Sequence, residues 1–192
     1  QHVHQEALQA YDFINVMVYD KTGVWRPNDI GPHSPWSYAE EAIRYLTEDL
    51  KIPAKRITLG VPFYGFDFAP PARYIDYREI IKEDISLAYR DSVGMKYYNG
   101  IPMIMRKTAM AKTLLGGVMI WEISSDTVSE LSLLRVIDQT RKAGDCSVTT
   151  FFRDEDGDGL GTMAKPFQAC TAPEGYVANM DDHDDSNPKT TH

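Results

Sequence analysis

What the sequence has little of already limits what the protein can be. It has two cysteines, Cys146 and Cys170, in 192 residues, which excludes a fold held by many disulfides. It has no apolar run of the length that crosses a bilayer, so we expect no membrane contact. Its 20 Lys and Arg residues, against 28 Asp and Glu, form no stripe that could neutralise phosphates. Nucleic acid is therefore not an expected partner.

The net charge of −8 is concentrated in the last quarter of the sequence. Residues 1–144 carry 18 acidic and 17 basic residues, whereas residues 145–192 carry 10 and 3. Hydrophobic periodicity also ends near Gly144. We therefore predict a domain with a real hydrophobic core over residues 1–144 and a small acidic module over residues 145–192. The sequence begins at Gln1 without a signal-peptide pattern, so we expect processing or truncation to have removed whatever preceded it.

Three apolar runs in the first part have the composition of buried parallel strands, and they cover residues 13–20, 56–65 and 118–122. Helical spacing of apolar residues predicts helices near residues 34–50 and 103–115, and a last helix over 127–142 capped by Ser124, Ser125 or Asp126. The pattern is three successive βα units, whose parallel strands should deliver side chains to their carboxyl ends. The alternative for the first run is a plain core strand with Asp20 as a cap.

The acidic module contains a pattern that is typical of calcium loops. Asp154, Asp156 and Asp158 occupy alternate positions, the spacing that places carboxylates around Ca²⁺. An EF-hand would need an acidic twelfth residue, where this sequence has Lys165. The two cysteines fit a disulfide in a module with little core, with two unpaired thiols as the alternative. A solvated acidic linker is the other interpretation of the whole stretch.

Several motifs resemble those of glycoside hydrolase family 18, which contains the chitinases and related endo-β-N-acetylglucosaminidases. Residues 17–20, M-V-Y-D, resemble the M-x-Y-D motif on the sixth barrel strand of that family. Residues 59–65 and 116–122 resemble its seventh and eighth strands, and residues 98–102 resemble the approach to the eighth. The resemblance implies an α/β fold, namely the C-terminal portion (strands 6 to 8 with their helices) of a (β/α)8 TIM barrel, followed by a small loop-rich calcium-binding tail.

The chemistry that the resemblance implies is substrate-assisted, retaining hydrolysis of chitin or related glycans of β-1,4-linked N-acetylglucosamine, with no cofactor in catalysis. Tyr19 would donate its phenol to the substrate's acetamido group, and Asp20 would hydrogen-bond the sugar at the cleavage point. Met17, Tyr64 and Trp121 would bind substrate, with Trp121 as the floor on which the sugar ring stacks. The enzyme is expected to be secreted by a bacterium.

Departures from the family pattern bear on activity. The family's catalytic acid belongs to a D-x-x-D-x-D-x-E motif, which this sequence lacks, and strand alternation points Glu122 away from the face of Trp121. We therefore predict that the chain alone is inactive. The alternatives are a catalytically inactive carbohydrate-binding member of the family and a calcium-dependent adhesion or spacer protein. Residues 66–117 leave little room for an inserted α+β domain, which indicates a shallow groove.

The tail resembles the thrombospondin type 3-like calcium repeats of secreted bacterial enzymes. Such repeats commonly have a cysteine where this sequence has His183, so Cys146 would take over as the partner of Cys170. The resemblance implies a structural Ca²⁺ ion held by carboxylates from two segments and one carbonyl group, namely Asp154, Asp156, Asp158, the carbonyl of Leu160, and Asp182, Asp184 or Asp185.

Overall fold

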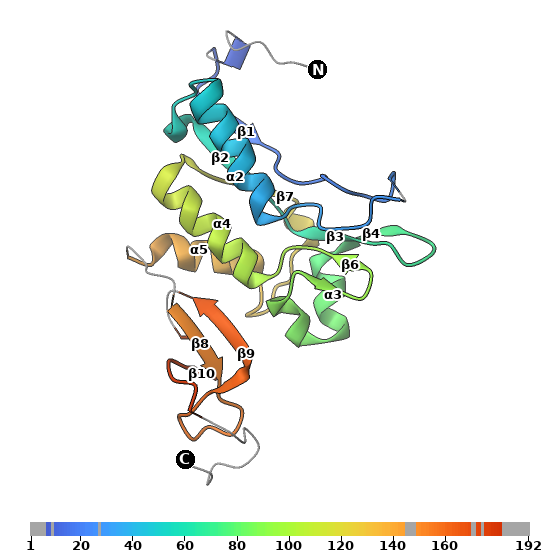
Figure 1. Cartoon of the computed structure of the whole chain (residues 1–192), viewed down its shortest axis with the longest axis vertical. Coiled ribbons are helices and arrows are strands. Elements are labelled where there is room, and N and C mark those ends of the chain that lie inside the picture. The colour runs from blue at the N-terminus through green and yellow to red at the C-terminus, as the bar shows by residue number, and fades with distance from the viewer. Residues whose placement is uncertain are drawn as a thin grey trace. The chain divides into compact units, whose positions relative to one another are not determined.

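The computed structural model describes residues 7–8, 10–26, 28–144, 149–169, 172–173 and 175–181. The chain divides into two compact units, Gln1–Arg141 and Lys142–His192, and Figure 1 shows the elements of each. The sequence places the boundary nearby, after Gly144.

A three-stranded parallel sheet forms the centre of the first unit. Its strands are ordered β1-β2-β7, and both pairs are parallel. They comprise β1 (Ile14–Val16), β2 (Ile57–Pro62) and β7 (Gly117–Trp121). Leu59 and Val61 in the central strand are fully buried, as expected where both faces of a strand are covered. The predicted parallel strands are therefore present.

β1 is shorter than the apolar run that predicts it. The run covers residues 13–20, but pairing with β2 ends at Val16, because the amide of Val18 donates back to the carbonyl of Val16 at 3.0 Å. The residues that follow leave the sheet, and Asp20 has a φ of 61°. This is the left-handed region, which Asp tolerates better than most residues. The prediction is wrong for the second half of the run.

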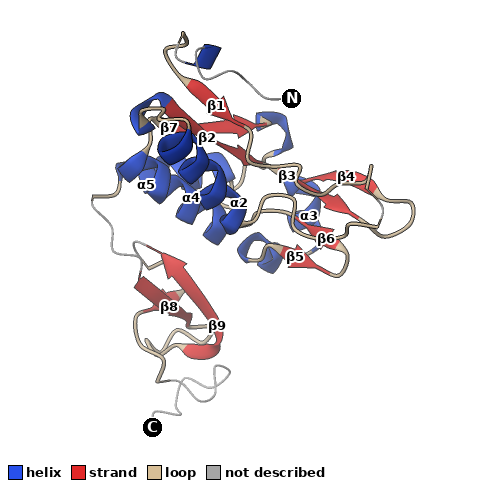
Figure 2. Cartoon of the chain, turned by 45° about the horizontal axis from the view of Figure 1, so that its top comes forward, coloured by secondary structure: helices blue, strands red, loops and turns tan. Residues whose placement is uncertain are grey.

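Helices α2 and α4 pack against the sheet, in front of its strands in Figure 2. α2 (Trp36–Arg44) continues into a π-helical turn (Tyr45–Asp49), and a short 3-10 turn (Ala54–Arg56) precedes β2. α4 (Ile101–Leu114) has a proline in its first turn, where the missing N–H is not needed. Both helices were predicted. One core joins them to the sheet: Val18, Ala39, Ile43, Leu46, Ile52, Ile57, Leu59, Ala111 and Leu115.

The last helix of the first unit, α5 (Leu133–Lys142), begins later than the predicted residue 127. A 3-10 turn (Ile123–Ser125) and a loop come first. The carboxylate of Asp126 reaches across this loop and accepts hydrogen bonds from the amides of Leu133 (2.9 Å) and Leu134 (3.0 Å). Asp126 therefore caps the helix as predicted. The residues between Asp126 and the helix form a loop that folds back, so that the Asp126 carboxylate meets the first helical amides.

A small α+β insertion lies between β2 and α4, although residues 66–117 were expected to leave little room for one. It contains an antiparallel sheet of order β4-β3-β6-β5 and one α-helix. The strands were missed because they are too short to show alternation. The elements are β3 (Tyr64–Asp67), β4 (Arg73–Asp76), α3 (Tyr77–Glu83), a 3-10 turn (Ile85–Tyr89), β5 (Ser92–Val93) and β6 (Lys96–Tyr97).

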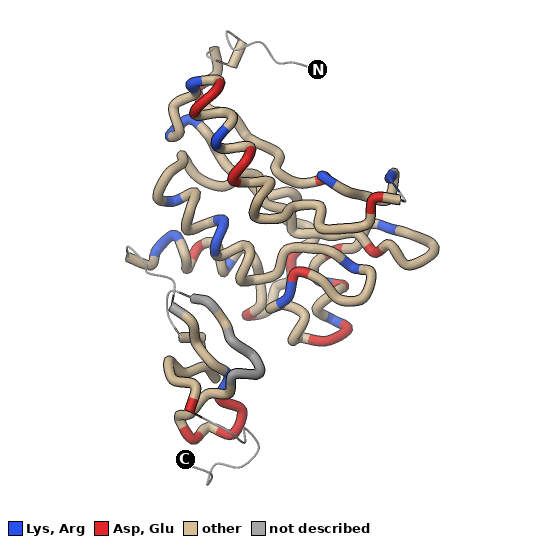
Figure 3. The backbone as a smooth tube through the Cα atoms, in the orientation of Figure 1, with Lys and Arg blue, Asp and Glu red and all other residues tan. Residues whose placement is uncertain are grey.

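The second unit contains an antiparallel sheet of order β10-β8-β9, which the sequence did not predict. Phe151 and Phe167 lie opposite each other and are buried, which gives even this small unit an apolar centre. Figure 3 shows acidic residues gathered in the loop that joins the first two strands. The strands are β8 (Thr149–Arg153), β9 (Thr162–Ala169) and β10 (Tyr176–Val177).

No helix in the described part of the chain combines the length and the apolar character needed to cross a bilayer.

Candidate functional site

The carboxyl ends of the three parallel strands bring the predicted site residues to one edge of the sheet. Tyr19 and Asp20 follow β1, Tyr64 follows β2, and Trp121 ends β7, opposite Pro62. In α/β proteins this edge is where side chains from different strands converge on a ligand.

Asp20 and Tyr64 are directly hydrogen-bonded. The Tyr64 hydroxyl donates to Oδ1 of Asp20 at 2.5 Å, and the Asp20 side chain keeps 43% of its surface exposed. Partial burial alone would raise the pKa of Asp20, but the Tyr64 hydroxyl and the neighbouring His33 hold it below its usual value. Asp20 is therefore an ionised carboxylate at neutral pH, fixed at one oxygen and accessible to a ligand.

His33 lies beside this carboxylate and was not predicted as a site residue. It is completely buried, its Nε2 lies 3.2 Å from the carbonyl of Tyr64, and its Nδ1 lies 3.7 Å from Oδ1 of Asp20. Because a carbonyl only accepts, Nε2 carries the hydrogen. Burial lowers the pKa of His33, and the charge of Asp20 acts against this. The only sequence signal was a polar pair, His33 and Ser34, between two prolines.

Tyr19 is placed as a hydrogen-bond donor. Its ring is buried and meets the ring of Tyr64 edge-on, with centroids 6.1 Å apart. Its hydroxyl is buried and has no hydrogen-bond partner among the described residues. Burial, and then the charge of Asp20, raise the pKa of Tyr19, so the phenol stays protonated. A buried phenol of this kind can donate to an oxygen of a bound ligand.

Tyr64 connects the site to the α+β insertion. Its ring stacks on the ring of Tyr74, with centroids 4.8 Å apart. The hydroxyl of Ser125 donates to Oδ1 of Asp76 at 2.7 Å, so it accepts from the Tyr74 hydroxyl, 3.0 Å away. Tyr74 from the insertion thus holds the Tyr64 ring, and Ser125 from the turn after β7 holds Tyr74. No sequence pattern pointed to Tyr74, Asp76 or Ser125.

Met17 and Trp121 differ from the other predicted residues because they are largely exposed, by 66% and 53%. The structure brings together Tyr19, Asp20 and Tyr64 and leaves these two as apolar surface at the ends of their strands. An exposed indole offers a flat face of the kind on which sugar rings stack. The peptide bond that joins Trp121 to Glu122 is cis.

Comparison with known proteins decides the family. The family model "Glycosyl hydrolases family 18" matches residues 2–126, which is more than half of the chain and includes all five predicted sugar-site residues. The chain belongs to glycosyl hydrolase family 18.

Relatives of known structure support this assignment of the family 18 chain. A family 18 chitinase from the chitin utilization locus of Flavobacterium johnsoniae is 42% identical, with a TM-score of 0.70 over 72% of this chain and 45% of its own. A chitinase from Bacteroides thetaiotaomicron is 28% identical, with a TM-score of 0.67 over 72% of this chain and 48% of its own. The mixed α/β fold is therefore that of family 18 chitinases.

A sequence relative gives the same result. Endochitinase 1 of Metarhizium robertsii is 27% identical over 166 residues, which are 66% of this chain and 38% of that protein. The family 18 chain thus spans less than half the length of each of these relatives.

The predicted calcium ligands lie in the loop between β8 and β9 of this family 18 chain. Asp154, Asp156 and Asp158 each present an oxygen within 4.8 Å of the others. Both oxygens of Asp154 accept loop amides, from Gly157 (2.7 Å) and Gly159 (3.1 Å), and both glycines have positive φ, 78° and 88°. The loop backbone therefore turns the carboxylates inward.

Only some of the other residues of the predicted calcium module lie within the part of the chain that the structure describes. The amide of Leu160 donates to Asp158 at 2.8 Å. Asn179, which was not predicted, ties the loop to the segment that follows β10, since it accepts from the Gly161 amide and donates to the Gly159 carbonyl. The remaining predicted ligands and the predicted disulfide lie outside the described residues: Asp182, Asp184, Asp185, Cys146 and Cys170.

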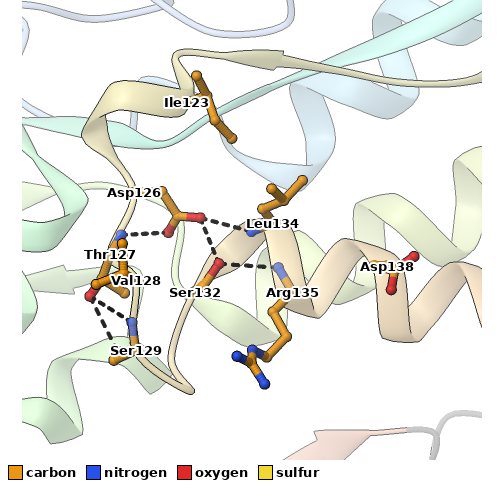
Figure 4. A pocket seen from close by; sticks show the side chains of 9 residues that line it. All are labelled: Ile123, Asp126, Thr127, Val128, Ser129, Ser132, Leu134, Arg135 and Asp138. Carbon is orange, nitrogen blue, oxygen red and sulfur yellow. Dashed lines mark hydrogen bonds between the residues drawn. The ribbon is translucent and has the colours of Figure 1, made fainter.

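A cavity of about 670 Å³ in the first unit is separate from the Asp20 cluster. Figure 4 shows that it lies between the turn after β7 and the start of α5. The carboxylate of Asp126 in its wall is already used by the amides of Thr127, Leu133 and Leu134 and by the hydroxyl of Ser132. This carboxylate serves the helix end, so we assign the cavity no ligand.

Proposed function

We propose that this chain contributes part of the active site of a secreted, chitinase-like glycoside hydrolase acting on polymers of β-1,4-linked N-acetylglucosamine. The observation that carries the proposal is the cluster of an ionised, accessible Asp20, the Tyr64 hydroxyl that fixes it, and the buried Tyr19 phenol beside them. In this proposal β1, β2 and β7 are the sixth, seventh and eighth strands of a (β/α)8 barrel. Secretion follows from the substrate, because an insoluble polymer has to be cut outside the cell.

The residues present fit substrate-assisted hydrolysis. The protonated phenol of Tyr19 donates to the acetamido group, whose oxygen attacks the anomeric carbon. The carboxylate of Asp20 accepts from the sugar at the cleavage point, and its preset position means that no reorganisation is needed as charge develops. Met17 and Trp121, which are exposed, supply the surface on which the sugar rests, and Tyr64, which is buried, acts through Asp20. The proton for the glycosidic oxygen comes from a Glu outside residues 1–192, since the D-x-x-D-x-D-x-E motif is not in this sequence.

Hydrolysis of a fluorogenic chitobioside tests this proposal. The protein that contains this sequence should turn the substrate over, and Asp20→Asn should lower kcat about a hundredfold or more. Asp29→Asn, in the exposed part of the same loop, is the matched control and should leave kcat unchanged. Residues 1–192 alone should give no turnover. Full activity of Asp20→Asn, or turnover by residues 1–192 that Glu122→Gln abolishes, would contradict the proposed roles.

The second candidate function is a catalytically inactive carbohydrate-binding member of family 18. The absence of the acid motif from this sequence favours it, because Tyr19, Asp20 and Trp121 could bind sugars without cleaving them. Titration calorimetry with a chitotetraose separates the two functions. Binding without turnover by the protein that contains this sequence would establish the second and exclude the first.

We also propose that the acidic loop of the second unit binds Ca²⁺ as a structural ion. The donor set fits a hard cation, since Asp154, Asp156 and Asp158 all offer carboxylate oxygens. Oδ2 of Asp158 is buried and accepts no hydrogen bond from the described residues. Six to eight oxygens are typical for Ca²⁺, and we expect the rest from the Leu160 carbonyl and from Asp182, Asp184 or Asp185.

Calcium titration of the full chain tests this second proposal. At about 100 times the dissociation constant, Ca²⁺ should stabilise the second unit by about 2.7 kcal/mol. Asp158→Asn should weaken binding about tenfold or more, whereas Asp181→Asn, at an exposed position, should change it little. A melting curve that is the same in EDTA and in millimolar calcium would contradict calcium binding, and the loop would then be a solvated acidic linker.

A further inference from the structure

A buried lysine outside the sugar site is connected to the Tyr19–Asp20 segment. Lys107 on α4 is completely buried. Its Nζ donates to three neutral oxygens, each at 2.7 Å: the carbonyl and the hydroxyl of Ser34, and Oδ1 of Asn99. An ammonium loses its hydration in such a place and is tolerated only where hydrogen bonds replace the water.

The hydrogen-bond directions fix the protonation state of this lysine. The hydroxyl of Ser34 gives its own hydrogen to the carbonyl of Val18 at 2.5 Å, so it can only accept from Lys107. The amide nitrogen of Asn99 donates to the carbonyls of Ser34 and Tyr98, which leaves Oδ1 to accept. All three partners of Nζ are acceptors, and only an ammonium has three hydrogens to give them.

Ser34, which Lys107 holds, and its chain neighbour His33 enclose Asp20 from both sides. Ser34 bonds the carbonyl of Val18, and the carbonyl of His33 accepts from the amide of Lys21 at 2.9 Å. Asp20 lies between these two bonds with its φ of 61°. A non-glycine residue in the left-handed region is strained and persists only where its surroundings impose it.

We propose that Lys107 is a positioning residue which, as an ammonium ion, holds Ser34 and, through it, the adjacent His33, and thereby keeps Asp20 in the left-handed conformation that presents its carboxylate at the sugar site. Its neutral form would give up one of the three hydrogen bonds. The proposal deepens the proposed function and rests on it only where sugar cleavage is measured.

The ionisable groups around Lys107 set the pH range of this arrangement. Burial lowers the pKa of Lys107 to about 7, and the charge of Asp91 acts against this. The carboxylate of Asp91 accepts the amide of Gly100 at 2.9 Å, and His33 is the other ionisable group that the charge of Lys107 affects. We expect the hold on Asp20 to weaken as the pH rises through the pKa of Lys107.

Lys107→Met tests the proposal, because it keeps the length of the side chain and removes all three donors. In the protein that contains this sequence, kcat for a fluorogenic chitobioside should fall about tenfold or more, while KM changes by less than about threefold. The Lys21 amide should exchange its hydrogen about tenfold faster or more. Thr108→Val is the matched control, because Thr108 is the buried neighbour on α4 and bonds the Ile104 carbonyl. It should change each quantity by less than about twofold.

The two measurements separate this proposal from the proposed function. If the unsubstituted protein cleaves no chitobioside, the proposed function fails. The exchange rate of the Lys21 amide is then the one measurement that tests the positioning role of Lys107. Unchanged exchange in folded Lys107→Met protein overturns the proposal. If that variant does not fold, Ser34→Ala takes its place, since it removes the hydroxyl between Lys107 and Val18. Independently, a side-chain ¹⁵N signal of Lys107 at pH 6 must be that of an ammonium, and a neutral amine there would also overturn the proposal.

Discussion

The hydroxyl of Tyr64 donates a 2.5 Å hydrogen bond to the carboxylate of Asp20, and so joins two residues that follow neighbouring parallel strands. Hydrogen bonds to charged groups are shorter and stronger than neutral ones. This bond therefore fixes both the position and the ionisation of the Asp20 carboxylate.

Tyr64→Phe should raise the pKa of Asp20, because the donor that stabilises the carboxylate is lost. The acid limb of the pH–activity profile should move to higher pH, and kcat should fall about tenfold or more. Carboxyl ¹³C titration measures the pKa directly. Tyr74→Phe is the control, since it keeps the ring that stacks on Tyr64 and loses only the bond to Ser125. An Asp20 pKa that responds equally to both substitutions would disprove the direct effect.

Tyr19→Phe and Trp121→Ala should weaken cleavage in different ways. Trp121 offers stacking area to the ground state and the transition state alike, so its loss should raise KM strongly. In the proposed mechanism the Tyr19 hydroxyl faces charge that develops during the reaction, so its loss should lower kcat more than it raises KM. Steady-state kinetics on the protein that contains this sequence measures both. Equal changes of kcat and KM in Tyr19→Phe would count against its role.

Gly60→Ala should displace Tyr19 and destabilise the first unit. A Cβ at this position of β2 would lie 2.6 Å from the carbonyl oxygen of Val16 and 2.9 Å from the Tyr19 ring. The backbone oxygen cannot give way easily, so we expect a loss of about 1–3 kcal/mol in the free energy of unfolding. Gly31→Ala is the control because its Cβ would meet nothing within 4 Å. Urea denaturation of the two variants checks this, and equal stability would show that the strand has room.

His33 should make the first unit less stable as the pH falls below about 6.5. Its folded pKa lies below the ordinary 6.5, so in this range the unfolded chain binds a proton that the folded chain does not. The stabilisation is complete above pH 6.5 and is lost on acidification, at higher pH than the effect of Asp20, whose pKa is lowered from 3.8. His33→Gln should flatten the dependence of the unfolding free energy between pH 5 and 6.5. The same slope in both proteins would assign the effect to other groups.

The parts of the site that the sequence could predict are those that lie next to one another in the chain. The run that ends in Tyr19 and Asp20 shows its strand character and its polar end together, and residues 59–65 contain Tyr64 in the same way. The three parallel strands and two of the helices followed from periodicity. These features depend on local pattern, which a sequence displays directly.

The parts that escaped prediction depend on contacts between distant residues. Lys107 looked like one more position in a helix, and only the fold brings it to Ser34. Tyr74 stacks on Tyr64 through an insertion whose strands have two to four residues, too few for a period to be visible. The late start of α5 was hidden because Asp126 satisfies the helix amides from beyond the loop, so the usual rule placed the helix directly after it.

The bonds of Asp126 also have a practical consequence. Its carboxylate accepts from Thr127 at one end of the loop and from Leu133 at the other, which closes the base of the loop, while Val128 near its tip is fully exposed. Because the base of the loop is closed, a structural change at its tip should not reach β7 or α5. Residue 128 is therefore a place at which a fluorophore or a short foreign peptide could be added to this unit without disturbing the cluster of Tyr19, Asp20 and Tyr64.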